Sequence, residues 1–230
     1  MLNPAGLVPF TTIDFPGRLA AVIFFQGCPL KCPFCHNPNL QSTESTESTM
    51  SWPEILTFLD KRRKRLDGVV LSGGEPLMQS DIVSAIQTLK DMGFQIAIHT
   101  SGVYTDKMVE VLPLINWVGF DVKAPWSKYD VLCGRSGLSQ AVAKSLSLLI
   151  ASGIDYEVRT TLDPRYLTIQ DVYDMAHILK QAGVETYTLQ KYRTFDTDNN
   201  PPSTTAINAF FEDKLLLKTL QEMFPQFTCR

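Results

Sequence analysis

The sequence predicts an α/β protein built on a parallel sheet. Short apolar segments alternate with amphipathic ones through most of its 230 residues. A complete eight-unit barrel usually needs about 250 residues, so six units fit this length better. Cysteine, glycine and charged clusters follow the predicted strands, and in parallel α/β folds ligands gather at the carboxyl ends of strands. We therefore expect an incomplete (β/α)6 barrel, a partial TIM barrel, that forms a single domain over residues 1–230.

Six apolar segments define the expected strands: Ala20–Phe25, Gly68–Ser72, Gln95–Thr100, Trp117–Val122, Asp155–Thr161 and Thr186–Gln190. Helical periodicity follows five of them, in Ser80–Met92, Tyr104–Leu112, Leu138–Ala151, Ile169–Gln181 and Thr205–Met223. Strands joined through helices pair in parallel, with right-handed crossovers.

A further helix lies between the first two strands. Ser51 and Glu54 have the spacing of a capping box, and the helix ends in the basic run 61–65. This run is either a solvated face or a docking patch for a partner protein. Residues 41–49, QSTESTEST, predict a mobile polar loop, and residues 203–230 a C-terminal helix and tail.

Composition sets limits on partners and location. The formal net charge of -3 gives no reason to expect a nucleic acid or an anionic membrane surface as partner. The N-terminal segment lacks a basic region and a long apolar core, so we do not expect a signal peptide, and the sequence contains no membrane-spanning run. We expect a cytoplasmic protein with reduced thiols.

Three of the five cysteines lie within eight residues, directly after the first strand. Cys28, Cys32 and Cys35 form a C-x3-C-x2-C pattern that lets one loop hold three corners of a 4Fe-4S cluster, with the fourth iron open. The alternatives are a zinc site, for which His36 is badly placed as the fourth ligand, and three unrelated buried thiols.

Charged residues on otherwise apolar strands mark a second cluster. Asp121 and Lys123 alternate on the fourth strand and are expected to face the barrel interior, and Arg159 on the fifth is a candidate carboxylate clamp. An internal ion pair between Asp121 and Lys123 is the alternative. Gly73 and Gly74 follow the second strand, either as a simple turn or to let the backbone approach a ligand.

The cysteine motif, with Phe34 before its third cysteine, resembles that of the radical S-adenosylmethionine superfamily. The segments IDFPG, FFQGC, CHNP, SGGEP, HTSG, GFDVKAP and DYEVRTT resemble the activating enzymes of glycyl radical enzymes, especially the group of anaerobic ribonucleoside-triphosphate reductase activating proteins. The resemblance implies an incomplete (β/α)6 barrel and a single 4Fe-4S cluster that cleaves S-adenosylmethionine reductively. The product radical takes hydrogen from a glycine of a partner enzyme, and flavodoxin or ferredoxin is the implied reductant.

The resemblance also implies roles for particular residues. Cys28, Cys32 and Cys35 are the catalytic cluster ligands. The S-adenosylmethionine site comprises Gly73, Gly74 and Glu75 at the amino group, Ser101 at a ribose hydroxyl, Lys123 at the carboxylate with Asp121 and Arg159 beside it, and Phe34 over the adenine. The alternative for Phe34 is an ordinary core aromatic residue.

Some positions depart from the family pattern. His99 stands where pyruvate formate-lyase activating enzymes carry an aspartate that holds a monovalent cation. The sequence therefore does not decide whether this chain has such a cation site. Gln190 and Tyr192, at the end of the sixth strand, are weak candidates for site residues. Cys133 and Cys229 are expected to be ordinary buried or surface thiols and not ligands. Two other functions remain open: a radical enzyme acting on a small molecule or peptide, and a noncatalytic iron-sulfur carrier or zinc module.

Overall fold

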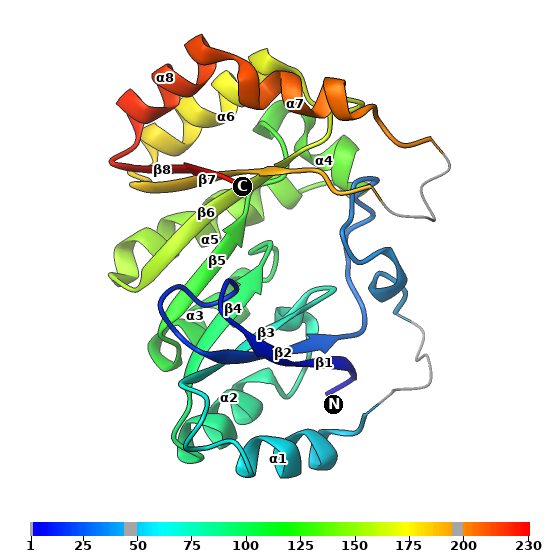
Figure 1. Ribbon diagram of the computed structural model, residues 1–230, viewed down its shortest axis with the longest axis vertical. Coiled ribbons are helices and arrows are strands. Elements are labelled where there is room, and N and C mark those ends of the chain that lie inside the picture. Colours follow the sequence, from blue (N-terminus) through cyan, green and yellow to red (C-terminus); the bar gives the residue numbers. More distant parts are fainter. Residues whose placement is uncertain (1, 44–49, 195–199) are drawn as a thin grey trace. The chain divides into compact units, whose positions relative to one another are not determined.

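A computed structural model describes residues 2–43, 50–194 and 200–230 (Figure 1). Most of the predicted polar loop 41–49 lies outside the described residues. The chain forms two compact units, which we describe separately. Unit 1 comprises Met1–Leu30, Asn37–Phe120 and Ala141–Tyr156, and unit 2 comprises Lys31–His36, Asp121–Gln140 and Glu157–Arg230. A single domain over residues 1–230 remains a prediction.

Unit 1 contains an open sheet whose strands follow one another in chain order. They are β1 (Pro4–Thr11), β2 (Ala20–Phe25), β3 (Gly68–Gly73), β4 (Gln95–Thr100) and β5 (Trp117–Asp121), whose last residue belongs to unit 2. β1 pairs with β2 antiparallel, and every later pair in this unit is parallel. The parallel strands therefore all end at one edge of the sheet.

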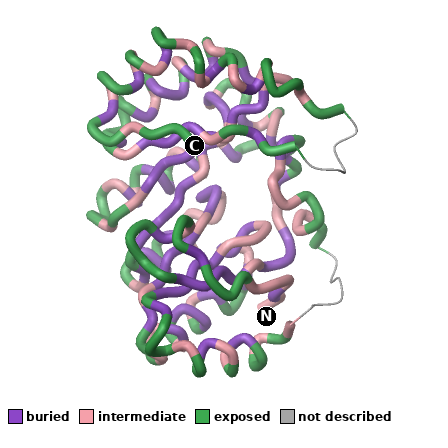
Figure 2. The backbone as a smooth tube through the Cα atoms, in the orientation of Figure 1, coloured by how far each residue is buried: buried purple, intermediate pink, exposed green. Residues whose placement is uncertain are grey.

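Helices join these strands and cover them (Figure 1). They are α1 (Trp52–Asp60), α2 (Ile82–Asp91), α3 (Thr105–Val111) and most of α5 (Leu138–Ser152), with short 3-10 turns at Pro38–Leu40, Pro76–Met78 and Leu112–Leu114. α1 begins with the predicted capping box between Ser51 and Glu54. Burial is greatest along the central strands and on the inner faces of the helices (Figure 2).

Unit 2 contains three further strands in chain order. They are β6 (Asp155–Leu162), whose first two residues belong to unit 1, β7 (Thr186–Lys191) and β8 (Gln226–Cys229), all parallel. Its helices are α4 (Trp126–Cys133), α6 (Ile169–Gln181), α7 (Thr204–Glu212) and α8 (Lys214–Met223). α6, α7 and α8 lie on one side of β7 and β8 (Figure 1).

The six predicted strands are confirmed as β2 to β7, and the structure adds β1, α4 and β8. One prediction was wrong in detail: the expected helix Thr205–Met223 is divided into α7 and α8. The division falls at Asp213, whose extended backbone ends α7 while its side chain accepts the N–H groups of Leu215 and Leu216 to begin α8. In the described part of the chain, no helix has both the length and the apolar character needed to cross a bilayer.

Candidate active site

In unit 1, two glycines let the end of β3 pack against the end of β2. A Cβ atom at Gly73 would lie 2.3 Å from the backbone nitrogen of Phe25, and one at Gly74 would lie 2.3 Å from the carbonyl oxygen of Gly27. Gly73 also has a φ of +120°, which side chains disfavour. The N–H of Glu75 donates to the Gly27 oxygen at 2.9 Å. The glycines of the SGGEP segment thus fix the loop that leads to Cys28.

Side-chain amides hold the base of the cysteine loop. Gln26 donates through Nε2 to the carbonyl oxygens of Asn39 and Ser42, at 3.1 and 2.8 Å. The N–H of Cys28 donates to the oxygen of Gln41 at 3.2 Å. Because Gln26 connects the outgoing and returning arms, the loop leaves β2 as a closed turn with Cys28 at its start.

Glu75 connects the ends of β3 and β4. Its carboxylate is buried, with 1% exposure, and accepts four hydrogen bonds: from the hydroxyl of Thr100, from the N–H and hydroxyl of Ser101, and from the N–H of Leu77. Burial raises the pKa of Glu75, and the four donors act against that rise. The structure therefore brings together Glu75 and Ser101, two predicted site residues 26 positions apart.

His99 contacts the N-terminal loop. Its Nε2 lies 2.9 Å from the carbonyl oxygen of Asp14, and its ring meets that of Trp117 at a centroid distance of 5.7 Å. A carbonyl oxygen only accepts, so Nε2 must carry the proton in this contact. The IDFPG segment is thus attached to β4 through His99, and its Phe15 is buried against Trp117.

In unit 2, the remaining motif cysteines lie on a turn that contacts the end of α4. The N–H of Cys35 donates to the oxygen of Cys32 at 3.3 Å, and the N–H of Lys31 donates to the oxygen of Cys133 at 3.0 Å. The sulfurs of Cys32 and Cys133 are 3.7 Å apart. The hydrogen bond with Cys133 lowers the pKa of Cys32 to about 7 against the effect of burial, and the Lys123 cation adds to the lowering.

Asp121 is placed between two cations. The Nε of Arg159 lies 2.8 Å from its Oδ1, and the Nζ of Lys123 lies 3.5 Å from its Oδ2. The predicted alternative, an Asp121–Lys123 ion pair, is therefore present, but Arg159 shares it. Burial opposes a charged Lys123, yet Asp121 and the neighbouring cysteines raise its pKa above the ordinary value. The three side chains together carry one net positive charge.

Aromatic residues that the sequence analysis did not select as a group pack beside the cysteine turn. Phe34 contacts Tyr166, and His36 contacts Tyr192, each at a centroid distance of 6.1 Å. The guanidinium of Arg165 lies over both tyrosine rings, at 5.4 and 5.0 Å. Burial lowers the pKa of His36 to about 4, and the positive charge of Lys123 is the second-largest cause of the lowering. The His36 ring is therefore neutral near pH 7.

Arg165 is itself fixed by a carboxylate. It forms an ion pair with Asp163, whose side chain is fully buried. The run LDPRY, residues 162–166, was the available sequence signal, because it places an acid and a base just past the end of β6.

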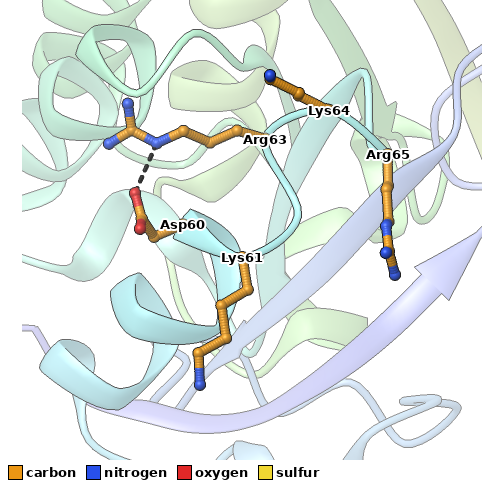
Figure 3. A pocket seen from close by; sticks show the side chains of 5 residues that line it. All are labelled: Asp60, Lys61, Arg63, Lys64 and Arg65. Carbon is orange, nitrogen blue, oxygen red and sulfur yellow. Dashed lines mark ion pairs between the residues drawn. The ribbon is translucent and has the colours of Figure 1, made fainter.

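A surface hollow at the end of α1 is lined by Asp60, Lys61, Arg63, Lys64 and Arg65 (Figure 3). Arg63 pairs with Asp60 at 2.7 Å, and both side chains are about half exposed. Exposed pairs of this kind contribute little to stability. The hollow lies near the start of β3, whereas the glycines and Glu75 lie at its other end, so it is not part of the candidate site.

The donor set suits an iron-sulfur cluster in its chemistry. All five cysteines are thiols, and Cys32, with a pKa near 7 beside the Lys123 cation, readily supplies a thiolate. Across residues 2–43, 50–194 and 200–230, no three His, Cys, Asp or Glu side chains are gathered as a metal site. Cys28 lies in unit 1, and Cys32 and Cys35 lie in unit 2.

Comparison with known proteins identifies the class. The model of the radical SAM superfamily matches residues 22–179, which contain the cysteine motif, the SGGEP segment and the Asp121 cluster. The chain belongs to the radical SAM superfamily.

Within that superfamily, the chain is similar to activating enzymes. The chain is 33% identical to a candidate glycyl-radical enzyme activating enzyme of Methanocaldococcus jannaschii, over 84% of this chain and 80% of the relative. It is 32% identical to the pyruvate formate-lyase-activating enzyme of Clostridium pasteurianum, over 79% and 78%. The predicted resemblance to glycyl-radical-enzyme activating enzymes is thus confirmed.

Solved structures share the fold. A domain of a pyruvate-formate lyase-activating enzyme from Bacteroides vulgatus matches with a TM-score of 0.55 and 15% identity, over 71% of this chain and 98% of that one. SuiB of Streptococcus suis bound to S-adenosylmethionine matches with a TM-score of 0.66 and 13% identity, over 91% of this chain. The chain spans about half of SuiB, 51% of its length. These matches confirm the predicted incomplete-barrel fold.

Proposed function

We propose that this protein cleaves S-adenosylmethionine reductively and generates a glycyl radical on a partner enzyme. The observation that carries the proposal is the C-x3-C-x2-C motif in a chain similar, over most of its length, to glycyl-radical activating enzymes. When bound and reduced, a 4Fe-4S cluster supplies the electron that breaks the C5'–S bond, and the resulting 5'-deoxyadenosyl radical takes a hydrogen from a glycine.

Each motif has a part in this proposal. Cys28, Cys32 and Cys35 hold the cluster through thiolates. Gly73 and Gly74 shape the segment that meets the amino group of S-adenosylmethionine. Glu75 fixes that segment to Ser101, whose hydroxyl oxygen retains capacity to accept from a ribose hydroxyl.

Lys123 and Arg159 in unit 2 recognise the carboxylate of S-adenosylmethionine. Arg159 and Lys123 both lie beside Asp121, and the net charge of these three side chains is positive, which favours binding of a carboxylate. Phe34, buried beside Tyr166, provides an apolar surface for the adenine.

The proposal extends to the partner enzyme and the reductant. The partner is an anaerobic ribonucleotide reductase or a related glycyl radical enzyme, and the electron comes from a flavodoxin or ferredoxin.

The test begins with anaerobic reconstitution with iron and sulfide. The protein should gain a 4Fe-4S spectrum, release 5'-deoxyadenosine with dithionite, and produce a glycyl radical signal in electron paramagnetic resonance when a partner enzyme is added. Cys28→Ala should abolish all three, whereas Cys229→Ala, which changes an exposed cysteine, should retain them. Unchanged 5'-deoxyadenosine release by Cys28→Ala would refute the mechanism.

A further inference from the structure

Cys133 is a buried thiol outside the cysteine motif. It is the last residue of α4, its exposure is 0%, and its sulfur lies 3.7 Å from that of Cys32. The two cysteines are 101 residues apart in the sequence. A thiol so placed contacts a proposed cluster ligand without being part of the motif.

The position of Cys133 is fixed by backbone contacts. Its carbonyl oxygen accepts the N–H of Lys31, the residue before Cys32, at 3.0 Å. Gly134 then adopts a left-handed conformation, with a φ of +74°, and the N–H of Arg135 returns to the oxygen of Asp130. A Cβ atom at Gly134 would lie 3.1 Å from the Cβ of Lys31, so the end of α4 packs tightly on the cysteine turn.

The chemistry of the pair determines which sulfur donates. A cluster ligand is a thiolate, which has no proton to give, so the S–H of Cys133 is the donor and Cys32 the acceptor. Hydrogen bonds to ligand sulfurs withdraw electron density and make a cluster easier to reduce. Reduction of the cluster is the step on which cleavage of S-adenosylmethionine depends.

We propose that Cys133 is a positioning residue that hydrogen-bonds the ligand sulfur of Cys32 and raises the reduction potential of the cluster. This inference rests on the proposed function, because it takes Cys32 as a cluster ligand. Cys133 itself does not bind iron, so the open iron is retained.

The first experiment tests the contact without a cluster. In the Cys28→Ala/Cys35→Ala variant, three cysteines remain: Cys32, Cys133 and Cys229. Treatment of the apoprotein with diamide, which takes one hydrogen from each of two thiols as their sulfurs join, should give a Cys32–Cys133 disulfide in peptide mass mapping. If Cys32 and Cys133 stay reduced, or if Cys32 pairs with Cys229 instead, the contact is wrong.

The second experiment tests the role by a potentiometric titration of the reconstituted protein, read by electron paramagnetic resonance. Cys133→Ala and Cys133→Ser both remove the sulfur, but serine retains a donor. At a fixed potential, Cys133→Ala should lower the ratio of reduced to oxidised cluster by about three- to tenfold, the size of one hydrogen bond. Cys133→Ser and Cys229→Ser should stay near the wild-type ratio.

The outcomes separate this inference from the proposed function. Equal shifts in Cys133→Ala and Cys133→Ser would show a packing effect, and no shift in either would show no influence; both results overturn the inference. If the wild-type protein assembles no 4Fe-4S cluster, the proposed function fails, whatever the diamide result.

Discussion

Ser101 donates both its backbone N–H and its hydroxyl to one oxygen of Glu75, Oε2, at 2.9 and 2.5 Å. The other oxygen, Oε1, accepts from Thr100 and from the N–H of Leu77. Two segments that the sequence marks separately, SGGEP and HTSG, are therefore joined through one buried carboxylate. In unit 1 this connection fixes the ends of β3 and β4 relative to each other.

Replacing this carboxylate by an amide should destabilise the fold. In Glu75→Gln, an NH2 group faces donors and leaves at least one of them unsatisfied, which costs about 1–3 kcal/mol. The free energy of unfolding of the apoprotein should fall by that amount, and the KM for S-adenosylmethionine should rise as Ser101 shifts.

The matched control is Glu54→Gln, the same change at an exposed capping box where glutamine also serves. Its unfolding midpoint in urea should stay near that of the wild type. If the midpoint of Glu75→Gln were also unchanged, the Glu75 carboxylate would not stabilise the fold.

A methyl group at Gly74 should disturb the cysteine loop. In Gly74→Ala, the new Cβ would lie 2.3 Å from the oxygen of Gly27 and 2.6 Å from that of Leu40, and backbone atoms must move. We expect a loss of about 1–3 kcal/mol of stability and less iron bound per chain after reconstitution. Gly6→Ala is the control, because its Cβ meets nothing within 4 Å. Equal iron contents in the two variants would show that the close approach is unimportant.

Local sequence patterns predict the strand ends but not the contacts between them. The spacing of Cys28, Cys32 and Cys35 lies within one loop, and the apolar strand preceding it is a local signal. The hydrogen bond from the Ser101 hydroxyl to Glu75 depends on how β3 and β4 pair. The contact between Cys32 and Cys133 depends on the packing of two segments that are 101 residues apart in the sequence. No periodicity in the sequence encodes such distances.

Some elements were missed for identifiable reasons. β1 contains Pro4 and Pro9, and proline in a strand is tolerated chiefly at a sheet edge, which is where β1 lies. α4, WSKYDVLC, has no clear apolar stripe, because Val131 is 88% exposed while Tyr129 and Cys133 are buried. β8 is four residues long, and its side chains are mostly exposed.

Asp171, in the first turn of α6, should make a pH-dependent contribution to the stability of the fold. Burial alone would raise its pKa, but hydrogen bonds from Lys128 and Thr168 more than offset this and lower the pKa below the ordinary 3.8. The carboxylate therefore stabilises the fold above pH 3.8, and this contribution is lost as the pH falls through the lower, folded-state value.

Asp171→Asn should cost about 1 kcal/mol in urea unfolding at pH 6, with the difference from wild type shrinking below the ordinary pKa. Asp174→Asn, an exposed change in the same helix, controls for the loss of a charge. A difference that persists undiminished in acid would show that the charge of Asp171 is not responsible.

Substitutions at Asp121 and Lys123 should have different effects: one should chiefly lower stability, and the other should chiefly weaken binding of S-adenosylmethionine. Asp121→Asn removes the carboxylate that pairs with the Arg159 guanidinium, and the Arg159 side chain is only 8% exposed. Losing one partner of a fully buried pair costs about 3–5 kcal/mol; because Asp121 is 31% exposed, we expect about 2 kcal/mol in urea unfolding. Lys123→Met leaves the Asp121–Arg159 pair intact but removes the net positive charge, so it should change stability less and weaken binding of S-adenosylmethionine more.

Unfolding in urea and equilibrium binding of S-adenosylmethionine to the reconstituted protein measure the two effects independently. The expected pattern is a large stability loss in Asp121→Asn and a large affinity loss in Lys123→Met. If Lys123→Met binds S-adenosylmethionine as the wild type does, the excess positive charge beside Asp121 does not recognise the carboxylate. That recognition would then have to come from Arg159, the other cation beside Asp121.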